Sequence, residues 1–170
     1  MKSSFACDSA TGIDPNRPTH DGNLRLATDL GFVESIELHC LPAEDVDLEI
    51  VRNRCDFALT SPPYFSKEHY SDDSTQSWVR YPTADPWREG FLRPMLRLQF
   101  TALKRGAVSV VNIDDVTIKG TTHPLTEWTK TIAADVGFKL VRVERLPLPS
   151  YWAAIAGVET SEPILIFERP

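Results

Sequence analysis

The order of apolar runs and chain breakers predicts an α/β fold, in which a mostly parallel sheet carries helices on both faces. Short apolar runs of strand length alternate with longer segments of helical periodicity, which is the pattern of successive β-α units. The chain has 170 residues, of which 42% are hydrophobic and 25% charged, as expected for a globular protein with one core. We therefore expect a single domain over residues 1–170.

The first half of the chain supplies three expected strands and one expected helix. Residues 11–14 form a short strand because a proline ends the run, and residues 20–30 form a helix that Gly31 terminates. The runs at 36–40 and 56–60 are short, apolar and followed by breakers, so we expect both to be strands.

The second half begins with a helix and ends with two strands. A helix over 92–104 leads through a glycine into the strongest strand signal, residues 107–113. A second helix over 122–136 is also ended by a glycine. Residues 138–145 then alternate apolar and polar side chains as an edge strand does, and a last apolar strand covers 163–169.

Composition argues against a membrane span, a disulfide framework and a metal site. The apolar runs fall short of the ~18 residues that a span requires, and residues 1–7 lack the apolar core of a signal peptide. The three cysteines, Cys7, Cys40 and Cys55, are odd in number and lack C-x-x-C spacing. The histidines show no metal-ligand spacing. We expect a cytoplasmic chain with reduced thiols and no metal.

The tetrapeptide Ser61-Pro62-Pro63-Tyr64 directly follows the strand expected at 56–60. Each proline fixes its own φ angle and restricts the residue before it, so the turn has few alternative conformations. It holds a hydroxyl, backbone carbonyl acceptors and an aromatic ring in a fixed relation. This arrangement suits a planar amino group, which the ring stacks on and the oxygens hydrogen-bond. The alternative is a proline-rich turn that only ends a core strand.

A long connection without clear periodicity follows, from residue 65 to residue 89. Loops of this length inside a compact domain are usually functional or disordered. Its aromatic and cationic side chains are suited to stacking on nucleobases: His69, Tyr70, Trp78, Arg80, Tyr81 and Trp87. The alternative is a lid whose aromatic side chains fold back over the sheet.

Several motifs together resemble those of the S-adenosylmethionine-dependent amino-methyltransferases that modify DNA bases. They are DFALTSPPY at 56–64, WREGFLRP at 87–94, GIDPN at 12–16, LPAED at 41–45 and EPILIF at 162–167. The resemblance covers nearly the whole chain from residue 11. It implies a Rossmann-like methyltransferase sheet that ends in an antiparallel strand pair. It also implies methyl transfer from S-adenosylmethionine to cytosine N4 or adenine N6 of DNA.

The resemblance gives Ser61, Pro62, Pro63 and Tyr64 the catalytic position. A base extruded from the duplex would stack on Tyr64, while Ser61 and the carbonyl of Pro62 accept its two N–H bonds. These bonds favour the pyramidal, charge-bearing nitrogen of the transition state over the flat ground state. Asn112, at the exit of the strongest strand, could help to shape this pocket.

The resemblance also implies where the methyl donor binds. Asp14 takes the position of the contact to the ribose diol, and Glu44 or Asp45 takes that of the contact to the adenine amino group. Each has a structural alternative. Asp14 could instead stabilise the N-terminus of the next helix, and the acidic run at 44–49 could be a solvated turn.

The charge distribution bears on DNA as a partner. A formal net charge of −6 is unfavourable for contact with phosphates. Residues 1–60 hold eleven acids against five bases, whereas residues 88–105 hold five bases against the single acid Glu89. These residues are compatible with a local basic face beside the Pro-Pro turn and equally with a solvated helix surface.

One part of the implied fold has no counterpart in the sequence. In the family, a first strand and a glycine-rich turn lie between the strands at 11–14 and 56–60, but none of the eight glycines forms a G-x-G motif. An open gap would leave buried backbone groups unpaired at roughly 1–3 kcal/mol each. Three explanations stay open: a missing N-terminal segment, a second chain that completes the sheet, or a re-paired, non-catalytic sheet. We expect this chain alone to bind S-adenosylmethionine weakly or not at all.

Two other functions stay open beside DNA methylation. One is methylation of RNA or of a side-chain amide, because a related Pro-Pro-Tyr turn serves glutamine modification and no target-recognition domain is recognisable. The other is a non-catalytic subunit derived from such an enzyme, which the absent glycine loop favours. No G-x-S-x-G motif surrounds a serine, so a Ser-His-Asp hydrolase is not supported.

Overall fold

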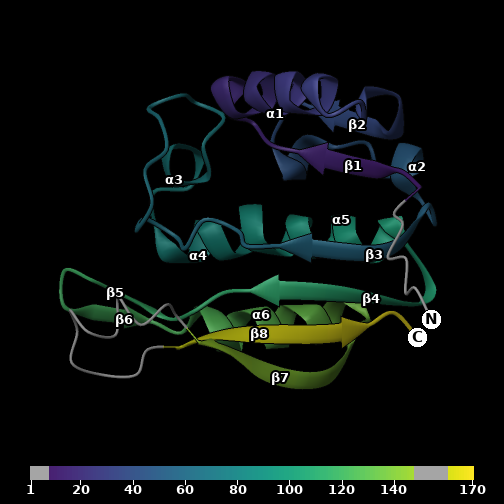
Figure 1. The fold of residues 1–170 in the computed structure, drawn as a ribbon. Coiled ribbons are helices and arrows are strands. Elements are labelled where there is room, and N and C mark those ends of the chain that lie inside the picture. The colour runs from purple at the N-terminus through teal and green to yellow at the C-terminus, as the bar shows by residue number, and fades with distance from the viewer. Residues whose placement is uncertain (1–7, 148–160) are drawn as a thin grey trace.

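The computed structural model describes residues 8–147 and 161–170, whose strands fall into three groups (Figure 1). The strands are β1 (Ala10–Ile13), β2 (Ile36–His39), β3 (Cys55–Thr60), β4 (Leu103–Asn112), β5 (Val116–Ile118), β6 (Thr121–His123), β7 (Lys139–Pro147) and β8 (Ser161–Glu168). One sheet has the order β3-β4-β8-β7, a second joins β1 to β2, and β5 and β6 form a hairpin.

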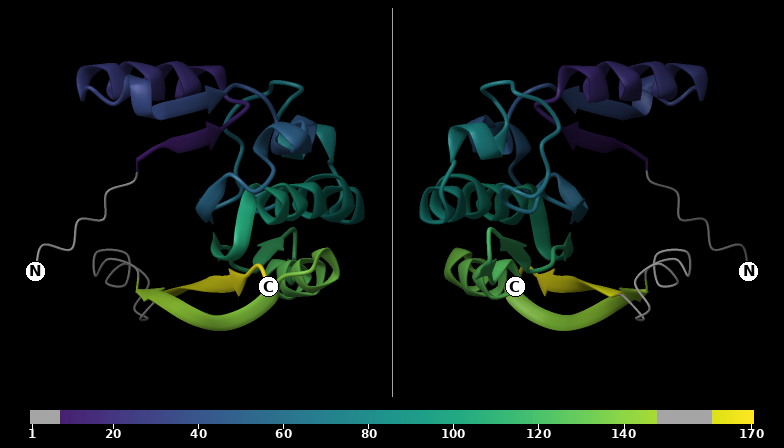
Figure 2. Two further views of the ribbon diagram at one scale, coloured as in Figure 1. Left: turned by 90° about the vertical axis from the view of Figure 1, so that its right-hand side faces the viewer. Right: turned by 90° about the vertical axis from the view of Figure 1, so that its left-hand side faces the viewer.

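Helices connect these strands. The α-helices are α1 (Arg17–Asp29), α2 (Leu48–Val51), α3 (Ser77–Arg80), α4 (Ala84–Trp87), α5 (Arg93–Ala102) and α6 (Leu125–Val136), with short turns η1 (Val33–Ser35), η2 (Ala43–Asp45) and a π-helical η3 (Arg88–Leu92). α4, η3 and α5 follow one another without a break. α5 and α6 lie together on one face of the four-stranded sheet (Figure 2).

The strand pairing confirms an α/β fold, but fewer of the strand pairs are parallel than the sequence predicted. β1 pairs with β2 and β3 with β4 in parallel. β8 is antiparallel to both β4 and β7, which confirms the antiparallel C-terminal pair and the edge position of β7. The described sheet is therefore mixed rather than mostly parallel. The segment expected to join the last two strands lies largely outside the described residues.

The core lies between α5, α6 and the four-stranded sheet. Trp87, Leu92, Leu96 and Leu125 are fully buried there. A buried polar pair crosses the same interface, where the Ser109 hydroxyl donates to the side-chain oxygen of Gln99 at 2.8 Å. This bond satisfies both groups, so the pair aligns α5 on β4 without an uncompensated polar atom.

Two local features differ from the sequence prediction. The helix expected from residue 122 begins at Leu125, because the preceding residues form the β5–β6 hairpin. Its turn places Lys119 and Gly120 at φ of 50° and 81°, the left-handed geometry of tight hairpin turns. β4 begins four residues before the expected start at 107, since the chain continues as a strand through Gly106 at φ 78°.

The termini of β1 and β3 define the region of functional interest. In Figure 1 the two strands point in the same direction, and no described strand lies between them.

The described helices include none that is long and apolar enough to cross a membrane. Cys40 and Cys55 are partly buried free thiols, whereas Cys7 lies outside the described residues.

A matched pair of leucine substitutions tests this core. Leu96→Ala removes a fully buried side chain and is expected to lower the free energy of unfolding by about 2–5 kcal/mol. Leu26→Ala, on the outer surface of α1, alters a side chain that is 56% exposed and should change it by about 0.5 kcal/mol or less. Urea denaturation of the two variants measures both values. Equal losses would contradict the assigned core.

Candidate functional site

The Ser61-Pro62-Pro63-Tyr64 turn reverses the chain sharply at the end of β3. The backbone N–H of Phe65 donates to the carbonyl of Pro63 at 2.9 Å, and Phe65 itself has a φ of 52°. A non-glycine residue in this left-handed region costs about 1–3 kcal/mol, and such strain clusters at functional sites. Buried Phe65 is held there by edge contacts to Trp87 and His123, at ring distances of 5.8 and 5.0 Å.

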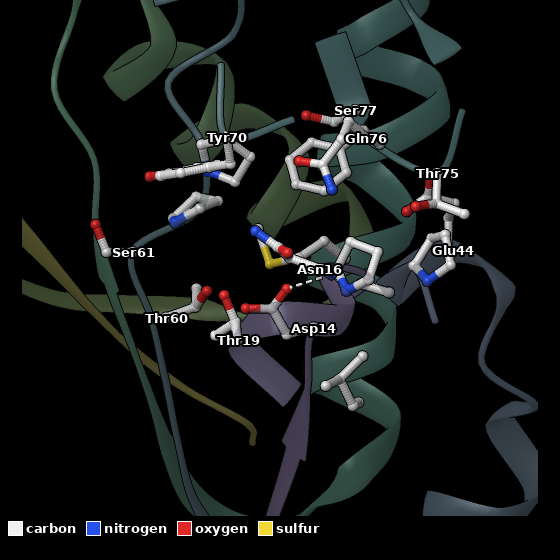
Figure 3. A pocket seen from close by; sticks show the side chains of 18 residues that line it. Asp14, Asn16, Thr19, Glu44, Thr60, Ser61, Tyr70, Thr75, Gln76 and Ser77 are labelled. Carbon is white, nitrogen blue, oxygen red and sulfur yellow. Dashed lines mark hydrogen bonds between the residues drawn. The ribbon is translucent and has the colours of Figure 1, made fainter. Parts of the chain in front are cut away.

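A cavity of about 380 Å³ opens beside this turn and brings most of the candidate residues together (Figure 3). Ser61, Pro62 and Pro63 line one side, while Asp14 and Glu44 line the other. The parallel direction of the strands explains this meeting. Asp14 follows β1, η2 follows β2 and the Pro-Pro turn follows β3, so all three reach the carboxyl edge, where open α/β sheets bind ligands.

Asp14 is held in place by local backbone bonds. Its N–H donates to the carbonyl of His39 at 3.1 Å, and its carboxylate accepts the N–H of Asn16 at 2.7 Å. The second bond is the turn that leads into α1, which was the structural alternative for this residue. The structure combines this turn with a place in the cavity wall, so the two roles are compatible.

Arg80 forms ion pairs with both acidic candidates, Glu44 and Asp45, which differ in exposure. One of its nitrogens lies 2.9 Å from a Glu44 oxygen and 3.0 Å from an Asp45 oxygen. Glu44 lines the cavity and its side chain is only 5% exposed, whereas Asp45 is 46% exposed and is not part of the lining. Burial raises the pKa of Glu44, although hydrogen bonding to its own backbone and the charge of Arg80 oppose the rise. Glu44 is therefore the acid that can face a ligand.

Three buried polar atoms in the cavity wall have no hydrogen-bond partner within the described structure. They are Asn16 Oδ1, Gln76 Nε2 and Ser77 Oγ. Buried polar groups are nearly always paired, so unpaired ones in a cavity need an explanation such as a bound ligand. Sequence reasoning missed Gln76 and Ser77, because only folding of the 65–89 connection brings them opposite Asp14.

Tyr64 does not present the open stacking face that the sequence predicted. Its side chain belongs to the core, is only 4% exposed and is not part of the cavity lining. Its hydroxyl lies 3.4 Å from Asn112 Oδ1, and burial is the main cause that raises its pKa to about 12. Tyr70 is 60% exposed and lines the cavity instead.

Asn112 connects the buried tyrosine to the exposed serine. Its side-chain oxygen accepts from the Ser61 hydroxyl at 3.4 Å, and its amide donates to the carbonyl of Pro163 at 3.2 Å. β3, β4 and β8 thus meet at this amide. The position of the Ser61 hydroxyl is therefore coupled to the sheet as well as to the prolines.

The aromatic residues of the 65–89 connection mostly pack inward. Trp87 is fully buried, and His69 stacks on Trp78 at a ring distance of 4.1 Å. The indole N–H of Trp78 donates to the carbonyl of Ser71 at 3.2 Å. These contacts favour the lid alternative for most of the segment, with Tyr70 as the exposed ring at the cavity.

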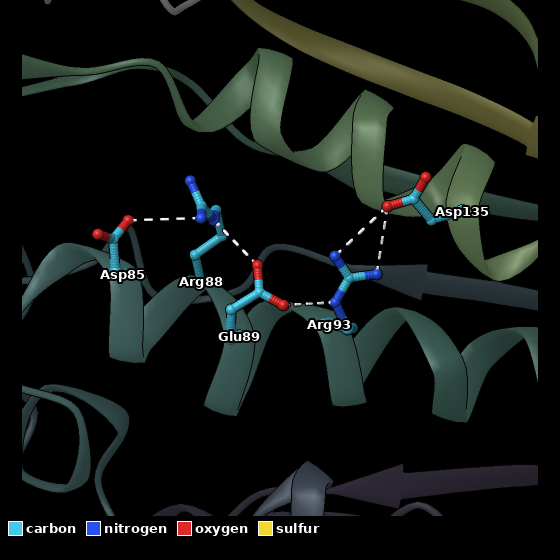
Figure 4. A network of polar contacts seen from close by, with 5 residues as sticks. All are labelled: Asp85, Arg88, Glu89, Arg93 and Asp135. Atoms are coloured by element: carbon cyan, nitrogen blue, oxygen red, sulfur yellow. Dashed lines mark hydrogen bonds and ion pairs between the residues drawn. The ribbon is translucent and has the colours of Figure 1, made fainter.

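The bases of residues 88–105 are largely neutralised by ion pairs (Figure 4). Arg88 contacts Asp85 and Glu89, and Arg93 contacts Glu89 at 2.6 Å and Asp135 at 3.4 Å. The hydrogen bond from Arg93 is the main cause that lowers the pKa of Glu89.

Lys104 completes this pattern, because it lies 2.8 Å from Asp56. These three bases therefore do not form a free cationic surface, because each of them is paired with an acid. No cluster of His, Cys, Asp and Glu that could hold a metal occurs in residues 8–147 or 161–170.

No protein-family profile matches the sequence, and no curated protein matches it either. Solved structures do match. The [4+2]-cyclase SpnF aligns with a TM-score of 0.61 and 14% identity, over 95% of this chain and 67% of that chain. A geranyl diphosphate methyltransferase solved with S-adenosylmethionine gives a TM-score of 0.61 and 10% identity, over 98% and 71%.

A third match is a candidate DNA modification methylase from Thermus thermophilus, with a TM-score of 0.54 and 16% identity over 95% of this chain and 53% of that chain. The chain has the methyltransferase fold. It spans from 53% to 71% of the length of these three proteins. At identities of 10–16% the likeness establishes the fold alone, and the cyclase among the matches carries a different reaction on it.

The Arg80–Glu44 ion pair makes a pH-dependent prediction. Because the pKa of Glu44 is raised above its ordinary value near 4.5, folding loses stability as pH rises through the raised value. Arg80→Met removes a lowering influence, so the pKa rises further and the loss grows. We expect the variant to lose about 1–3 kcal/mol of unfolding free energy near neutral pH, and less below about pH 4.

Urea denaturation across this pH range measures the difference. The control is Arg52→Met, whose partner Glu49 is 72% exposed, and it should leave the free energy of unfolding almost unchanged at any pH. A loss for Arg80→Met that does not depend on pH would contradict the assigned pairing.

Proposed function

We propose that this chain transfers a methyl group from S-adenosylmethionine to the exocyclic amino group of a DNA base, cytosine N4 or adenine N6. One observation carries the proposal. A single cavity at the carboxyl edge of a methyltransferase fold holds Asp14 and Glu44 opposite the rigid Ser61-Pro62-Pro63 turn. The matching DNA modification methylase supports the choice of DNA.

The residues of the cavity fit the donor. Asp14 would accept hydrogen bonds from the ribose diol, and Glu44 from the adenine amino group. The unpaired Asn16 Oδ1, Gln76 Nε2 and Ser77 Oγ offer one acceptor, one donor and one group that can act as either. A nucleoside with hydroxyl and amino groups on its rim would satisfy these atoms. When bound, S-adenosylmethionine supplies an electrophilic methyl group.

Ser61 and its neighbours would activate the target nitrogen. The lone pair of an exocyclic amine is delocalised into the ring, so the free base is a poor nucleophile. The Ser61 hydroxyl oxygen and the Pro62 carbonyl would accept its two N–H bonds and favour the pyramidal nitrogen. Because Ser61 is no general base, the proton would leave to water after transfer.

Tyr70, rather than Tyr64, would stack on the target base. It is the exposed aromatic of the cavity wall, and base–aromatic stacking is worth about 1–3 kcal/mol. Tyr64 would act indirectly: its buried hydroxyl would hold Asn112, which in turn contacts the Ser61 hydroxyl. Pro63 would keep the turn rigid between them.

A non-catalytic subunit is the second candidate, and two features of the described structure favour it. Arg80 occupies one oxygen of Glu44 in the described structure, while β1 and β3 are not joined in one sheet. Both features would weaken donor binding in this chain alone. RNA or a side-chain amide remains the alternative substrate, because the cavity residues would contact only the amino group and not the rest of the substrate.

A methyl-incorporation assay tests these functions. The chain would be assayed on unmethylated DNA as it stands and with a strand, glycine turn and helix fused ahead of Ala10. We expect incorporation only with the fusion, and Ser61→Ala should lower that rate by about a hundredfold. The matched control is Ser66→Ala, whose hydroxyl contacts His69 and not the cavity, and which should keep the rate.

The outcomes separate the candidates. Incorporation into RNA or protein but not into DNA would mean that DNA is not the substrate. No incorporation into any of them, from a fused chain that folds, would favour the non-catalytic subunit. Equal rates for Ser61→Ala and Ser66→Ala would contradict the role of the Pro-Pro turn.

A further inference from the structure

The WREGFLRP segment at 87–94 contains a glycine that none of the roles above explains. Gly90 is the central residue of the π-helical turn η3, which continues directly into α5. A glycine inside a helix costs roughly 0.5–1 kcal/mol relative to alanine, so it needs a local reason. π-helical turns are rare and frequently lie at functional sites. Because the next residue, Phe91, lines the cavity, the surroundings of Gly90 bear on the site.

The ring of Tyr81 packs directly on Gly90. A Cβ atom at position 90 would lie less than 3.0 Å from three atoms of this ring, closer than real Cβ atoms approach their neighbours. Tyr81 is itself partly buried against the core, and its backbone N–H donates to the carbonyl of Ser77 at 2.9 Å. The ring therefore has little room to withdraw, and glycine is the residue that allows this contact.

The guanidinium of Arg80 is a second neighbour of the Tyr81 ring. Its carbon lies 5.8 Å from the ring centroid, within the range of a cation–π contact. Its two terminal nitrogens contact the two oxygens of Asp45 at 3.0 and 3.1 Å. One of these nitrogens also lies 2.9 Å from Oε1 of Glu44. The guanidinium is thus held at once by an aromatic ring and by a bidentate carboxylate.

Glu44 depends on this guanidinium, because its other surroundings disfavour a charged carboxyl group. Burial is the main cause that raises the pKa of Glu44, and the charge of Asp45 acts in the same direction. Burial and then the charge of Glu44 raise the pKa of Tyr81. Arg80, Asp45 and Tyr81 are the titratable groups that act most strongly on Glu44, and Arg80 is the cation among them. The position of Arg80 therefore controls how far Glu44 stays ionised and where its carboxylate points.

We propose that Gly90 and Tyr81 are positioning residues for Glu44. We call Gly90, Tyr81 and Arg80 the clamp: the glycine admits the ring, the ring supports the guanidinium, and the guanidinium fixes one oxygen of the Glu44 carboxylate. Asp45, which does not line the cavity, anchors the guanidinium. The inference rests on the proposed function only for what Glu44 binds, the adenine amino group of the donor. A carboxylate with a fixed orientation loses less rotamer entropy on binding that group.

Carbon-13 NMR of the Glu44 carboxyl group across a pH titration tests the clamp in the full chain without methyl donor or DNA. Tyr81→Leu removes the ring without adding bulk and should raise the pKa of Glu44, because Arg80 loses its support. Tyr81→Phe removes only the hydroxyl and should raise the pKa less. Equal shifts for the two variants would mean that the hydroxyl acts instead of the ring. That result would overturn the proposal, as would an unchanged titration for Tyr81→Leu.

Two glycine variants provide the matched control. Gly90→Ala forces the ring away and should also raise the pKa of Glu44. Gly22→Ala in α1, whose added Cβ meets only the end of the Arg25 side chain at 4.0 Å, should leave it unchanged. The double variant Gly90→Ala/Tyr81→Leu separates overpacking from positioning. It should regain most of the stability that Gly90→Ala loses, while the pKa of Glu44 stays raised. An unshifted Glu44 titration in the double variant would contradict the clamp.

Binding of adenosine and of purine riboside, which lacks the amino group, connects the clamp to the proposed function. In the chain with the fused strand, glycine turn and helix, adenosine should bind about tenfold more tightly, and Tyr81→Leu should reduce this ratio severalfold. No preference for adenosine would overturn the amino group as the ligand of Glu44, whereas the NMR shifts would still support the clamp. Tighter adenosine binding by Tyr81→Leu would mean that Arg80 blocks Glu44, and would overturn the positioning role.

Discussion

The parallel direction of β1, β2 and β3 is the constraint on which the site depends. Each of these strands ends at the same edge and is followed at once by a chemically distinct element: the Asp14 turn, the acidic η2 turn and the Pro-Pro turn. Residues far apart in the sequence therefore face one cavity. α5 supports this arrangement from behind, because its Met95 contributes to the lining of that cavity.

The two halves of the site rest on supports of different strength. The Pro-Pro turn belongs to a four-stranded sheet, is tied to β4 through Asn112 and is packed through Phe65. Asp14 belongs to a two-stranded pair, and two-stranded units are only marginally stable without further packing. The strained, rigid Pro-Pro turn thus faces a less strongly supported wall that contains Asp14 and Glu44. The ion pair from Arg80 to Glu44 links the 65–89 connection directly to that wall.

The sequence was most informative where local chemistry decides the outcome. The strands at 11–14, 36–40 and 56–60 and the helix end at Gly137 depend on apolar runs and breakers, and the structure has them within a few residues. Only the family resemblance placed Asp14 and the Pro-Pro turn in one site, and the structure has both in the wall of one cavity. The β5–β6 hairpin was missed, because its strands are only three residues long and the second overlaps the start of the helix expected over 122–136.

Features that depend on tertiary partners could not be read from the chain. The burial of Tyr64 depends on the core around it and on Asn112 at the end of β4, and an aromatic residue in a turn has the same local sequence whether it is buried or exposed. The same holds for Arg93 and Lys104, because their partners Asp135 and Asp56 lie far away in the sequence. The unpaired atoms of Gln76 and Ser77 exist only because a long connection closes over the cavity.

The most direct test of the central claim is an NMR titration with S-adenosylmethionine of the isotope-labelled chain that carries the fused strand, glycine turn and helix, which is the form expected to bind the donor. The account predicts saturable shifts at the backbone amides of Asp14 and Ser77 and at the side-chain amides of Asn16 and Gln76, with the far edge at β7 unchanged. Saturable shifts at another surface, or none at these groups at the highest donor concentration, would contradict it.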